Sequence, residues 1–267
     1  MPMIDVNGLA THYTLDGPKD APVLTFVPGQ SFTLETWAGQ VPAFSDRFRV
    51  LCLDLRGHGG TALGDIKDKL RMSDLAGDVI GLWDELGIEK SHYVGKSLGG
   101  MMAYEMALEH ADRLHSVTFV ATQGLMPDGS LERMRGYVAE FRASERKMGL
   151  AAERLLARYL PEDYKSRDPE GFAQLERAIT ALSVDSYAYT TEAINAMRYD
   201  ARLGEIKTPT MVIAGEIDAP TPPARMEIYR DQIAGAGWAV IEGAAHLPNF
   251  EKPEAFNQAL ANFLDAL

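Results

Sequence analysis

Three features are scarce in this sequence, and each absence excludes a class of protein. The chain has one cysteine, Cys52, among 267 residues, so it forms no internal disulfide, and no cysteine–histidine cluster has the spacing of a metal site. Basic residues are outnumbered, with 26 Lys and Arg against 38 Asp and Glu. The net charge of −12 disfavours nucleic acid as a partner, because phosphates need a basic surface.

Long apolar runs are the third absence. No stretch of about 18 apolar residues occurs, which predicts that the chain does not span a membrane. The first residues lack the basic stretch and the apolar segment of a secretory signal. Together with the single cysteine, these absences favour a cytoplasmic protein. No pattern in the sequence specifies an oligomeric state.

What is present is an alternation of short apolar runs with helical stretches, in a chain that is 46% hydrophobic. This alternation predicts an α/β fold with a mainly parallel, doubly wound sheet. An antiparallel hairpin at the sheet edge is expected from residues 3–6 and 11–15, turned by Asn7-Gly8. The other expected strands are 23–27, 50–53, 93–94, 117–120, 211–214 and 239–241.

One stretch, residues 124–204, contains no convincing strand. We interpret it as a helical lid inserted into a core made of residues 1–123 and 205–267. The lid carries 12 Lys and Arg against 13 Asp and Glu, so it is much less acidic than the core. This balance fits a lid that admits an anionic substrate, or solvated helix faces whose charges are paired. Helices are expected at 131–147, 150–159, 169–182 and 186–197.

The segment Gly95-Lys96-Ser97-Leu98-Gly99 is a G-x-S-x-G motif between an apolar run and a helical stretch. This strand–turn–helix context is the one that a nucleophile elbow requires. It places the Ser97 hydroxyl at the tip of a sharp turn, where the first N–H groups of the helix face a developing oxyanion. Gly95 and Gly99 lack a Cβ, so the strand and the helix can approach closely. The same context disfavours the alternative, an ordinary glycine-rich turn.

An acid and a histidine follow the serine at the expected places. Asp218 lies in the turn after one late apolar run, and His246 lies in the loop after the next. Glu216 is close enough to compete for the role of the acid, but the spacing of Asp218 from Gly215 and Pro222 favours Asp218. The order serine, acid, histidine is the one typical of α/β-hydrolases.

The remaining histidines are interpreted as structural or exposed. They lie in predicted strands, beside a helix end or in the Arg-Gly-His-Gly turn, and are His12, His92, His110, His115 and His58. Only His246 combines a loop after a late strand with a helix that begins soon after it.

These residue types define a mechanism that needs no metal ion or organic cofactor. A serine hydroxyl is a poor nucleophile until a base takes its proton. His246, with an ordinary pKa near ~6.5, can take and return that proton near neutral pH. Asp218 would hold the imidazole in the right tautomer and stabilise the imidazolium. An acyl-enzyme would form on Ser97, and water would release it.

Taken in order, these segments resemble the α/β-hydrolase superfamily along the whole chain, and within it the 3-oxoadipate enol-lactonases and related small esterases and lactonases. The resemblance implies a mainly parallel, eight-stranded sheet flanked by helices, with an inserted helical lid. It also implies hydrolysis of a small ester or lactone, with an enol-lactone as one candidate. The segments that carry the resemblance are 54–61, 95–100, 185–200, 206–218 and 243–253.

The resemblance also assigns an oxyanion hole and a substrate contact. The two backbone donors correspond to Gln30 and Leu98. The basic–aromatic pair of lactonase lids corresponds to Arg158 and Tyr159, with Arg158 as the contact for a carboxylate. The chain departs from the family at Pro28, which stands where most relatives carry histidine. Proline has no N–H, but this position need not donate, so the hole can survive.

Two side chains near the nucleophile have more than one interpretation. The Gln30 amide either contacts the substrate or points to solvent. Lys96 is a second departure from the family: its cation could bias substrate choice, or stabilise the elbow through a carboxylate partner. In relatives the side chain at this position points away from the pocket into neighbouring structure, which favours a structural role.

Two other functions remain open beside the hydrolysis of a small ester or lactone. A hydrolase that cleaves a carbon–carbon bond in a vinylogous diketone uses the same triad, although the His-Gly-Gly-Gly type of oxyanion loop is missing here. A non-catalytic receptor would keep the pocket without turnover, although a full triad argues against it. Dehalogenase and epoxide hydrolase chemistry is disfavoured, because relatives with those activities carry aspartate in place of the serine.

Overall fold

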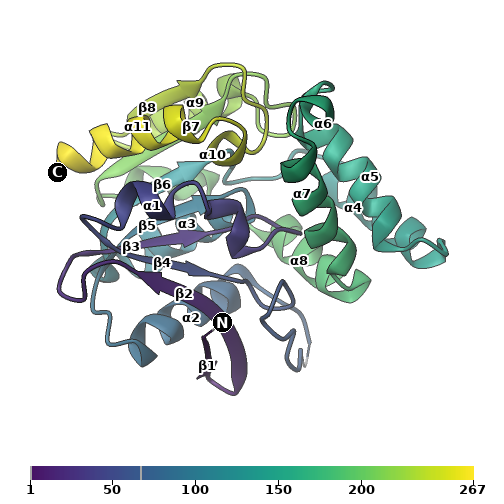
Figure 1. Ribbon diagram of the computed structural model, residues 1–267, viewed down its shortest axis with the longest axis horizontal. Coiled ribbons are helices and arrows are strands. Elements are labelled where there is room, and N and C mark those ends of the chain that lie inside the picture. Colours follow the sequence, from purple (N-terminus) through teal and green to yellow (C-terminus); the bar gives the residue numbers. More distant parts are fainter. Residues whose placement is uncertain (1, 67) are drawn as a thin grey trace.

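The computed structural model describes residues 2–66 and 68–267, and its centre is an eight-stranded sheet (Figure 1). The strand order is β1-β2-β4-β3-β5-β6-β7-β8. The pairs β1–β2 and β2–β4 are antiparallel, and all other neighbours are parallel. The strands are β1 (Met3–Val6), β2 (Leu9–Asp16), β3 (Val23–Val27), β4 (Arg49–Leu53), β5 (Ser91–Lys96), β6 (Leu114–Val120), β7 (Thr210–Gly215) and β8 (Gly237–Ile241).

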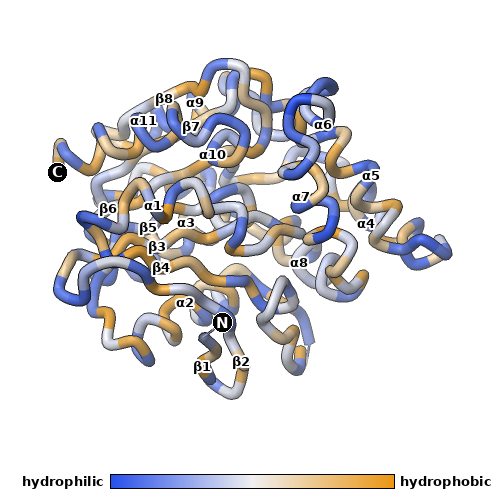
Figure 2. The backbone as a smooth tube through the Cα atoms, in the orientation of Figure 1, coloured by the Kyte–Doolittle hydropathy of each residue, from blue (hydrophilic) through white to orange (hydrophobic). Residues whose placement is uncertain are grey.

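The sheet has an apolar core on each face, because its central strands are buried on both sides. All five residues of β3 are buried. Val23 and Val27 belong to the core on one face, whereas Leu24 and Phe26 belong to the core on the other. A continuous apolar run of this kind is expected for a parallel strand covered on both sides. In Figure 2 the colours of the central strands, including β3 and β4, show that their residues are mostly hydrophobic.

Helices cover both faces of the sheet. One core contains Trp83 of α2, Met102 of α3 and Met226 of α9. The opposite core contains Phe44 of α1 and Phe256 of α11. The α-helices are α1 (Val41–Phe44), α2 (Met72–Glu85), α3 (Leu98–Glu109), α4 (Ser130–Ala143), α5 (Met148–Tyr159), α6 (Tyr164–Arg167), α7 (Pro169–Ala181), α8 (Val184–Ala196), α9 (Pro223–Gln232), α10 (Pro248–Glu251) and α11 (Pro253–Asp265).

Helices α4 to α8 follow one another between β6 and β7 and gather on one side of the molecule (Figure 1). The only β-type pairing in this stretch, all of whose residues are described, is an isolated bridge between Leu125 and Arg198. The helices share an apolar cluster of their own. That cluster includes Phe32 from the loop after β3 and Leu247 from the loop after β8, so the helices pack directly on these two loops.

The N-terminal hairpin predicted from the sequence is confirmed. β1 and β2 pair at the edge of the sheet, and the turn residues Asn7 and Gly8 have φ values of 54° and 82°. Positive φ at both central residues is the property of a type I′ turn, which matches the twist of a hairpin. Among the described residues, no helix has the length and apolar character needed to cross a membrane.

Three local expectations need correction. The helix expected over 131–147 ends at Ala143, and a new helix begins at Met148. Lys147 separates the two with a positive φ of 44°, which a right-handed helix cannot continue through. The short helix α6 was not expected, because four residues are too few to show a periodic pattern. His115 lies inside β6 rather than beside a helix end.

Gly215, at the end of β7, marks very close packing between the sheet and the loop after β8. A Cβ at this position would lie 1.9 Å from the Ala245 carbonyl oxygen. Backbone atoms cannot move aside as a flexible side chain can. We therefore expect Gly215→Ala to lower the free energy of unfolding by about 2 kcal/mol or more, measured by chemical denaturation.

Gly77 in α2 provides the matched control, because a Cβ there would meet no atom within 4 Å. Alanine favours a helix interior over glycine, so Gly77→Ala is expected to raise the free energy of unfolding by about 0.5–1 kcal/mol. Similar values for the two variants would contradict the steric explanation.

Candidate active site

The turn between β5 and α3 holds Ser97 in a strained conformation. Its φ of 51° and ψ of −109° lie outside the usual regions for a residue with a Cβ. The Ser97 N–H donates to the Val120 carbonyl oxygen (2.9 Å), and the Ser97 carbonyl oxygen accepts from the Thr122 hydroxyl (2.8 Å). A Cβ at Gly95 would lie 2.1 Å from the Gly99 carbonyl oxygen. Backbone contacts therefore hold the strain, and glycine leaves room for the turn.

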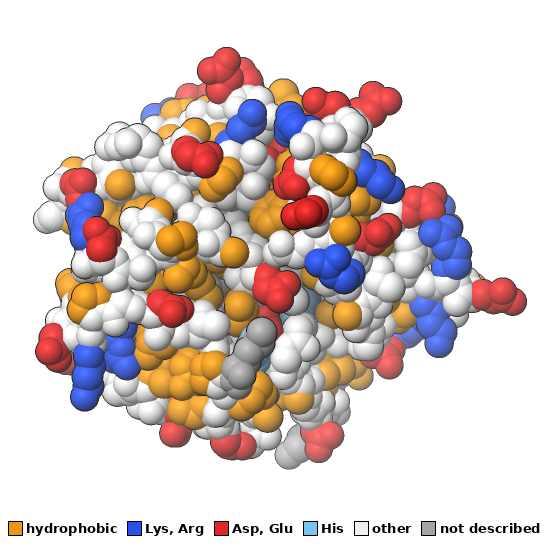
Figure 3. Space-filling model, in the orientation of Figure 1, with side chains coloured by type: hydrophobic (Ala, Val, Ile, Leu, Met, Phe, Trp, Pro, Cys, Tyr) orange, Lys and Arg blue, Asp and Glu red, His pale blue; other side chains and the backbone are white. Residues whose placement is uncertain are grey.

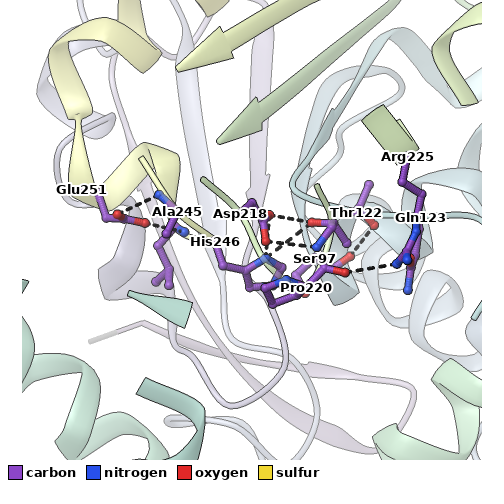
Figure 4. A network of polar contacts seen from close by, with 11 residues as sticks. Ser97, Thr122, Gln123, Asp218, Pro220, Arg225, Ala245, His246 and Glu251 are labelled. Carbon is purple, nitrogen blue, oxygen red and sulfur yellow. Dashed lines mark hydrogen bonds and ion pairs between the residues drawn. The ribbon is translucent and has the colours of Figure 1, made fainter. Parts of the chain in front are cut away.

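Ser97, His246 and Asp218 form a continuous chain of hydrogen bonds (Figure 4). Ser97 Oγ lies 3.1 Å from His246 Nε2, and His246 Nδ1 lies 2.9 Å from Asp218 Oδ2. The three residues follow β5, β8 and β7, respectively. They meet because parallel strands bring their carboxyl ends to one edge of the sheet. Asp218 and His246 are each 2% exposed, so their contact is shielded from water.

Asp218, rather than Glu216, contacts the histidine. Thr221 donates to Asp218 through its N–H (3.0 Å) and its hydroxyl (2.6 Å). Burial by itself would raise the pKa of Asp218, but His246 and the Thr221 hydrogen bonds outweigh burial and lower this pKa below its ordinary value. Glu216 instead accepts the Gly243 N–H at 2.9 Å. The carboxylate that faces His246 is therefore ionised at neutral pH.

The electrostatic surroundings of His246 favour a neutral ring. Burial lowers the pKa of His246 below its ordinary value of 6.5, and the nearby Lys96 acts in the same direction. Asp218 opposes both effects, since a carboxylate stabilises the imidazolium. A neutral ring with its proton on Nδ1, toward Asp218, leaves Nε2 as an acceptor for the Ser97 hydroxyl.

The loop that carries His246 is held from two sides. Glu251 accepts the N–H groups of Ala245 (2.9 Å) and Leu247 (2.8 Å), so one carboxylate spans the residues on either side of the histidine. On the other side, the His246 N–H donates to the Tyr159 carbonyl oxygen at 3.0 Å. The rings of Tyr159 and His246 lie 4.7 Å apart between centroids. Helix α5, which ends at Tyr159, thus helps to place the histidine.

Gln30 lies in the loop after β3, and its buried side chain is bound to α8. The amide nitrogen Nε2 donates to Thr190 Oγ1 (2.8 Å), to Thr191 Oγ1 (3.1 Å) and to the Tyr187 carbonyl oxygen (3.1 Å). The expectation that the amide points to solvent is therefore wrong. Its N–H groups are not directed at a substrate either, because buried acceptors on α8 already bind them.

The two backbone N–H groups expected to form the oxyanion hole are both available. In the part of the chain that the structure describes, neither the Gln30 N–H nor the Leu98 N–H has a hydrogen-bond acceptor. Leu98 begins α3, and the first N–H groups of a helix have no partner within it. The Gly99 N–H instead donates to the Pro28 carbonyl oxygen at 3.1 Å. Pro28 thus acts as an acceptor, and its missing N–H costs the site no donor.

Lys96 is buried beneath the elbow, with 3% of its surface exposed. Its Nζ lies 4.7 Å from the centroid of the Phe32 ring and 5.6 Å from that of the Tyr159 ring. It has no hydrogen-bond partner among residues 2–66 and 68–267, so the carboxylate partner considered for it is not in contact. Burial lowers the pKa of Lys96 to about 7, although Asp218 and Glu251 act in the opposite direction. The side chain points into neighbouring structure and does not line the pocket.

A pocket opens beside Ser97 and is walled largely by the helices between β6 and β7. Ser97, His246 and Gln30 line it, and Met101 and Ile194 contribute apolar surface. The cavity volume is about 90 Å³, which is small beside the ~300–1,000 Å³ of typical ligand pockets. A small substrate fits this space best. Within the described residues, no cluster of His, Cys, Asp and Glu is arranged to hold a metal ion.

Three arginines line the pocket, although the chain as a whole is acidic. Arg154 pairs with Glu140 (2.6 Å), and Arg133 donates to Ser130 Oγ (3.0 Å). Arg158 also lines the pocket and has no ion pair to any residue that the structure describes. Figure 3 shows acidic and basic side chains interspersed over one face of the molecule, without a continuous basic surface. The pocket thus brings together three of the basic residues of an acidic chain.

The pocket contains both predicted lid contacts and some residues that the sequence did not indicate. Arg158 and Tyr159, which the resemblance suggests as substrate contacts, both line the pocket. Arg133 and Arg154 were missed, because their helices meet only in three dimensions. Thr221 was missed although its spacing from an aspartate is typical of a side chain–backbone turn, which was an available signal.

Comparison with known proteins identifies the family of this chain. The chain matches the family model described as alpha/beta hydrolase fold over residues 22–253. It is 29% identical to 3-oxoadipate enol-lactonase 2 of Acinetobacter baylyi, over 94% of this chain and 92% of that protein. It is 25% identical to the putative carbamate hydrolase RutD of Agrobacterium fabrum, over 95% of this chain and 97% of that protein.

Solved structures agree with this assignment. The enol-lactonase from Burkholderia xenovorans LB400 is 32% identical and matches with a TM-score of 0.92, covering 99% of this chain and all 100% of that one. A thermophilic esterase from Thermogutta terrifontis is 27% identical with a TM-score of 0.88, covering 97% and 94%. The predicted fold, an eight-stranded and mostly parallel sheet flanked by helices, is confirmed. The chain is an enzyme that belongs to the alpha/beta hydrolase fold family.

Proposed function

We propose that this protein hydrolyses a small carboxylic ester or lactone that itself carries a carboxylate, through an acyl-enzyme on Ser97. The observation that carries the proposal is the hydrogen-bond chain from Ser97 through His246 to Asp218, beside a small pocket (Figure 4). The enol-lactonases of A. baylyi and B. xenovorans, which are similar over nearly their whole length, favour a lactone and specifically an enol-lactone.

In this mechanism His246 Nε2 accepts the hydroxyl proton of Ser97 as Oγ attacks the carbonyl carbon of the substrate. Asp218 holds the Nδ1–H and stabilises the imidazolium that forms. The bond from the carbonyl carbon to the leaving oxygen breaks, and the imidazolium returns its proton to that oxygen. Water then attacks the Ser97 ester with His246 as base, and the acid is released. With a lactone, the leaving oxygen stays on the acyl chain, so one ring-opened product forms.

The N–H groups of Gln30 and Leu98 stabilise the oxyanion of each tetrahedral intermediate. Both donors are free in the described chain, which supports this role. Loss of a single donor of this type typically costs roughly 3–4 kcal/mol of transition-state stabilisation. Pro28 and Gly99 keep the two donors on facing segments through their own backbone hydrogen bond.

Residues 124–204 act as a lid in this proposal, over a core of residues 1–123 and 205–267. Its support is that α4, α5 and α8 supply much of the pocket wall and that the lid residue Tyr159 contacts His246. The lid also brings the positive charge. Arg158 forms no ion pair within the described chain, so its guanidinium is available to a substrate carboxylate.

A fluorophosphonate probe, read by intact mass, tests whether Ser97 is activated. Ser97→Ala is expected to lose labelling and to lower ester hydrolysis by at least about 10³-fold, because no other group supplies the nucleophile. Ser116→Ala is the control, since Ser116 is a buried serine of β6 that contacts His92. It should label like the parent protein. An absence of labelling in the folded parent would contradict the proposal and favour the non-catalytic receptor.

Arg158→Gln tests the carboxylate contact. A charge-assisted hydrogen bond contributes about 1.5–3 kcal/mol, so KM for a carboxylate-bearing ester should rise about 10-fold or more, with little change for its neutral methyl ester. Arg142→Gln is the control, because Arg142 pairs with Asp185 outside this pocket. Equal changes in KM for the charged and the neutral substrate would show that Arg158 does not bind the carboxylate.

The pH dependence of kcat/KM tests the role of His246. Protonated His246 cannot accept the Ser97 proton, so activity falls as the pH drops through its pKa. Because burial lowers this pKa, the midpoint is expected below pH 6.5. Lys96→Met removes a cation that also lowers the pKa of His246, so the midpoint should move to higher pH. Lys207→Met, on the surface, should leave it unchanged. A shift to lower pH in Lys96→Met would overturn this account.

A further inference from the structure

Ser31, which follows Gln30 in the loop after β3, has a left-handed backbone. Its φ is 71°, and the next residue, Phe32, donates its N–H to the Gly29 carbonyl oxygen at 3.2 Å. This is the arrangement of a type II turn, whose third position normally holds glycine or asparagine. A serine at this position is strained, and such strain persists only where surrounding contacts hold it.

The contact that holds Ser31 comes from its backbone. The Ser31 Oγ is buried and has no hydrogen-bond partner in the described part of the chain. The Ser31 N–H, however, donates to His58 Nε2 at 3.0 Å. His58 belongs to the Arg-Gly-His-Gly turn after β4 and is 1% exposed. This histidine is not part of the Ser97–His246–Asp218 chain.

The two contacts of His58 define its protonation state. Nε2 can accept a hydrogen bond only without a proton, so the proton is on Nδ1, which donates to the Arg56 carbonyl oxygen at 3.0 Å. Both ring nitrogens are then satisfied in the neutral form. Burial lowers the pKa of His58 and so opposes protonation, while the Asp54 carboxylate acts in the other direction. The ring is a neutral acceptor at neutral pH.

The turn that presents His58 is fixed by Asp54. Asp54 Oδ1 accepts the Leu34 N–H (2.7 Å), and Oδ2 accepts the Gly60 N–H (2.9 Å). The same Oδ2 lies 2.6 Å from His12 Nδ1. Asp54 therefore ties the loop after β3 to the loop after β4. The imidazole makes a second tie between these loops, closer to the oxyanion donor.

We propose that His58 is a positioning residue for the oxyanion hole, and that it fixes the Gln30 backbone by accepting the Ser31 N–H. This inference rests on the proposed function of the site. Without the acceptor, the Ser31 N–H is buried and unpaired, and the turn relaxes toward forms that serine adopts without strain. The Gln30 side chain is already bound to α8, so His58 provides the fixed point on the other side of the donor.

Loss of the His58 contact is expected to slow the chemical step. The oxyanion exists only in the transition state and the tetrahedral intermediate, so a misplaced donor lowers kcat and leaves KM nearly unchanged. A histidine that only stabilised the fold would change the free energy of unfolding without this separation of kcat from KM. The distinction gives the experiment its readout.

Two polar substitutions separate the two ring nitrogens. In His58→Asn the side-chain amide reaches the place of Nδ1 and keeps the Arg56 contact. In His58→Gln it reaches the place of Nε2 and can accept from Ser31. We expect His58→Asn to lower kcat by about 10- to 100-fold, because an oxyanion donor must be accurately placed. His58→Gln should recover most of this loss. The control His92→Asn alters a partly buried histidine of β5 and should change neither constant.

A double variant tests whether the strain at Ser31 is the cause. Glycine adopts a positive φ without support, so Ser31→Gly combined with His58→Asn should regain part of the lost kcat. Hydrogen–deuterium exchange of the peptide spanning residues 27–34 gives a readout that needs no turnover. Exchange should be faster in His58→Asn than in His58→Gln or the parent protein.

The outcomes distinguish the two proposals. Equal kcat and equal exchange in His58→Asn and His58→Gln would overturn the positioning role, and so would a double variant that regains nothing. A parent protein that binds no fluorophosphonate would defeat the proposed function. In that case the exchange data still decide whether His58 holds the turn. If His58→Asn fails to fold, His58→Gln and the double variant are each compared with the parent protein.

Discussion

The segments that carry the site are packed so closely that three of their glycine positions leave no room for a Cβ, and the geometry of the site depends on this steric limit. Added Cβ atoms at Gly95, Gly99 and Gly215 would lie 2.1, 2.4 and 1.9 Å from backbone oxygens of neighbouring segments. The close approach allows backbone hydrogen bonds to hold Ser97 at its strained φ. It also brings the loops after β5, β7 and β8 near enough for their side chains to form one hydrogen-bond chain. The hydrogen-bond geometry of the site therefore depends on tight backbone packing.

The buried charged groups near the site differ in the hydrogen bonds that they form. The carboxylate of Asp218 receives hydrogen bonds from Thr221, and that of Glu251 receives two backbone N–H groups, so each has donors that oppose the effect of burial. For Asp218 they help to lower the pKa, whereas burial still raises the pKa of Glu251. The ammonium of Lys96 lies beside two aromatic rings and has no hydrogen-bond acceptor in the described chain. This difference explains why burial lowers the pKa of Lys96 to about 7. The Lys96 ammonium can therefore lose its proton near neutral pH.

The sequence predicted those parts of the site that depend on local pattern. The elbow needs adjacent glycines, and Asp218 and His246 each follow a short strand with apolar residues, so a parallel sheet brings them to one edge. The remaining contacts depend on packing between segments far apart in the chain. Glu251 lies in a short helix whose burial no local pattern reveals. The partners of the Gln30 amide lie about 160 residues away on α8, at positions that resemble any polar helix face. The helix boundary at Ala143 was missed for a related reason, since a charged residue gave no sign of its positive φ.

The anchoring of Gln30 on α8 also constrains how this enzyme can diversify. One amide links the loop after β3, which carries the proposed oxyanion donor Gln30, to helix α8, which lines part of the pocket. Helices exchanged with a relative to alter substrate choice would arrive without Thr190 and Thr191 unless the donor carried equivalent hydroxyls. The incoming helices would then leave the buried Gln30 amide without acceptors, and the backbone around Gln30 would lose an anchor. A change of the helices that shape the pocket therefore also changes the contacts that hold Gln30.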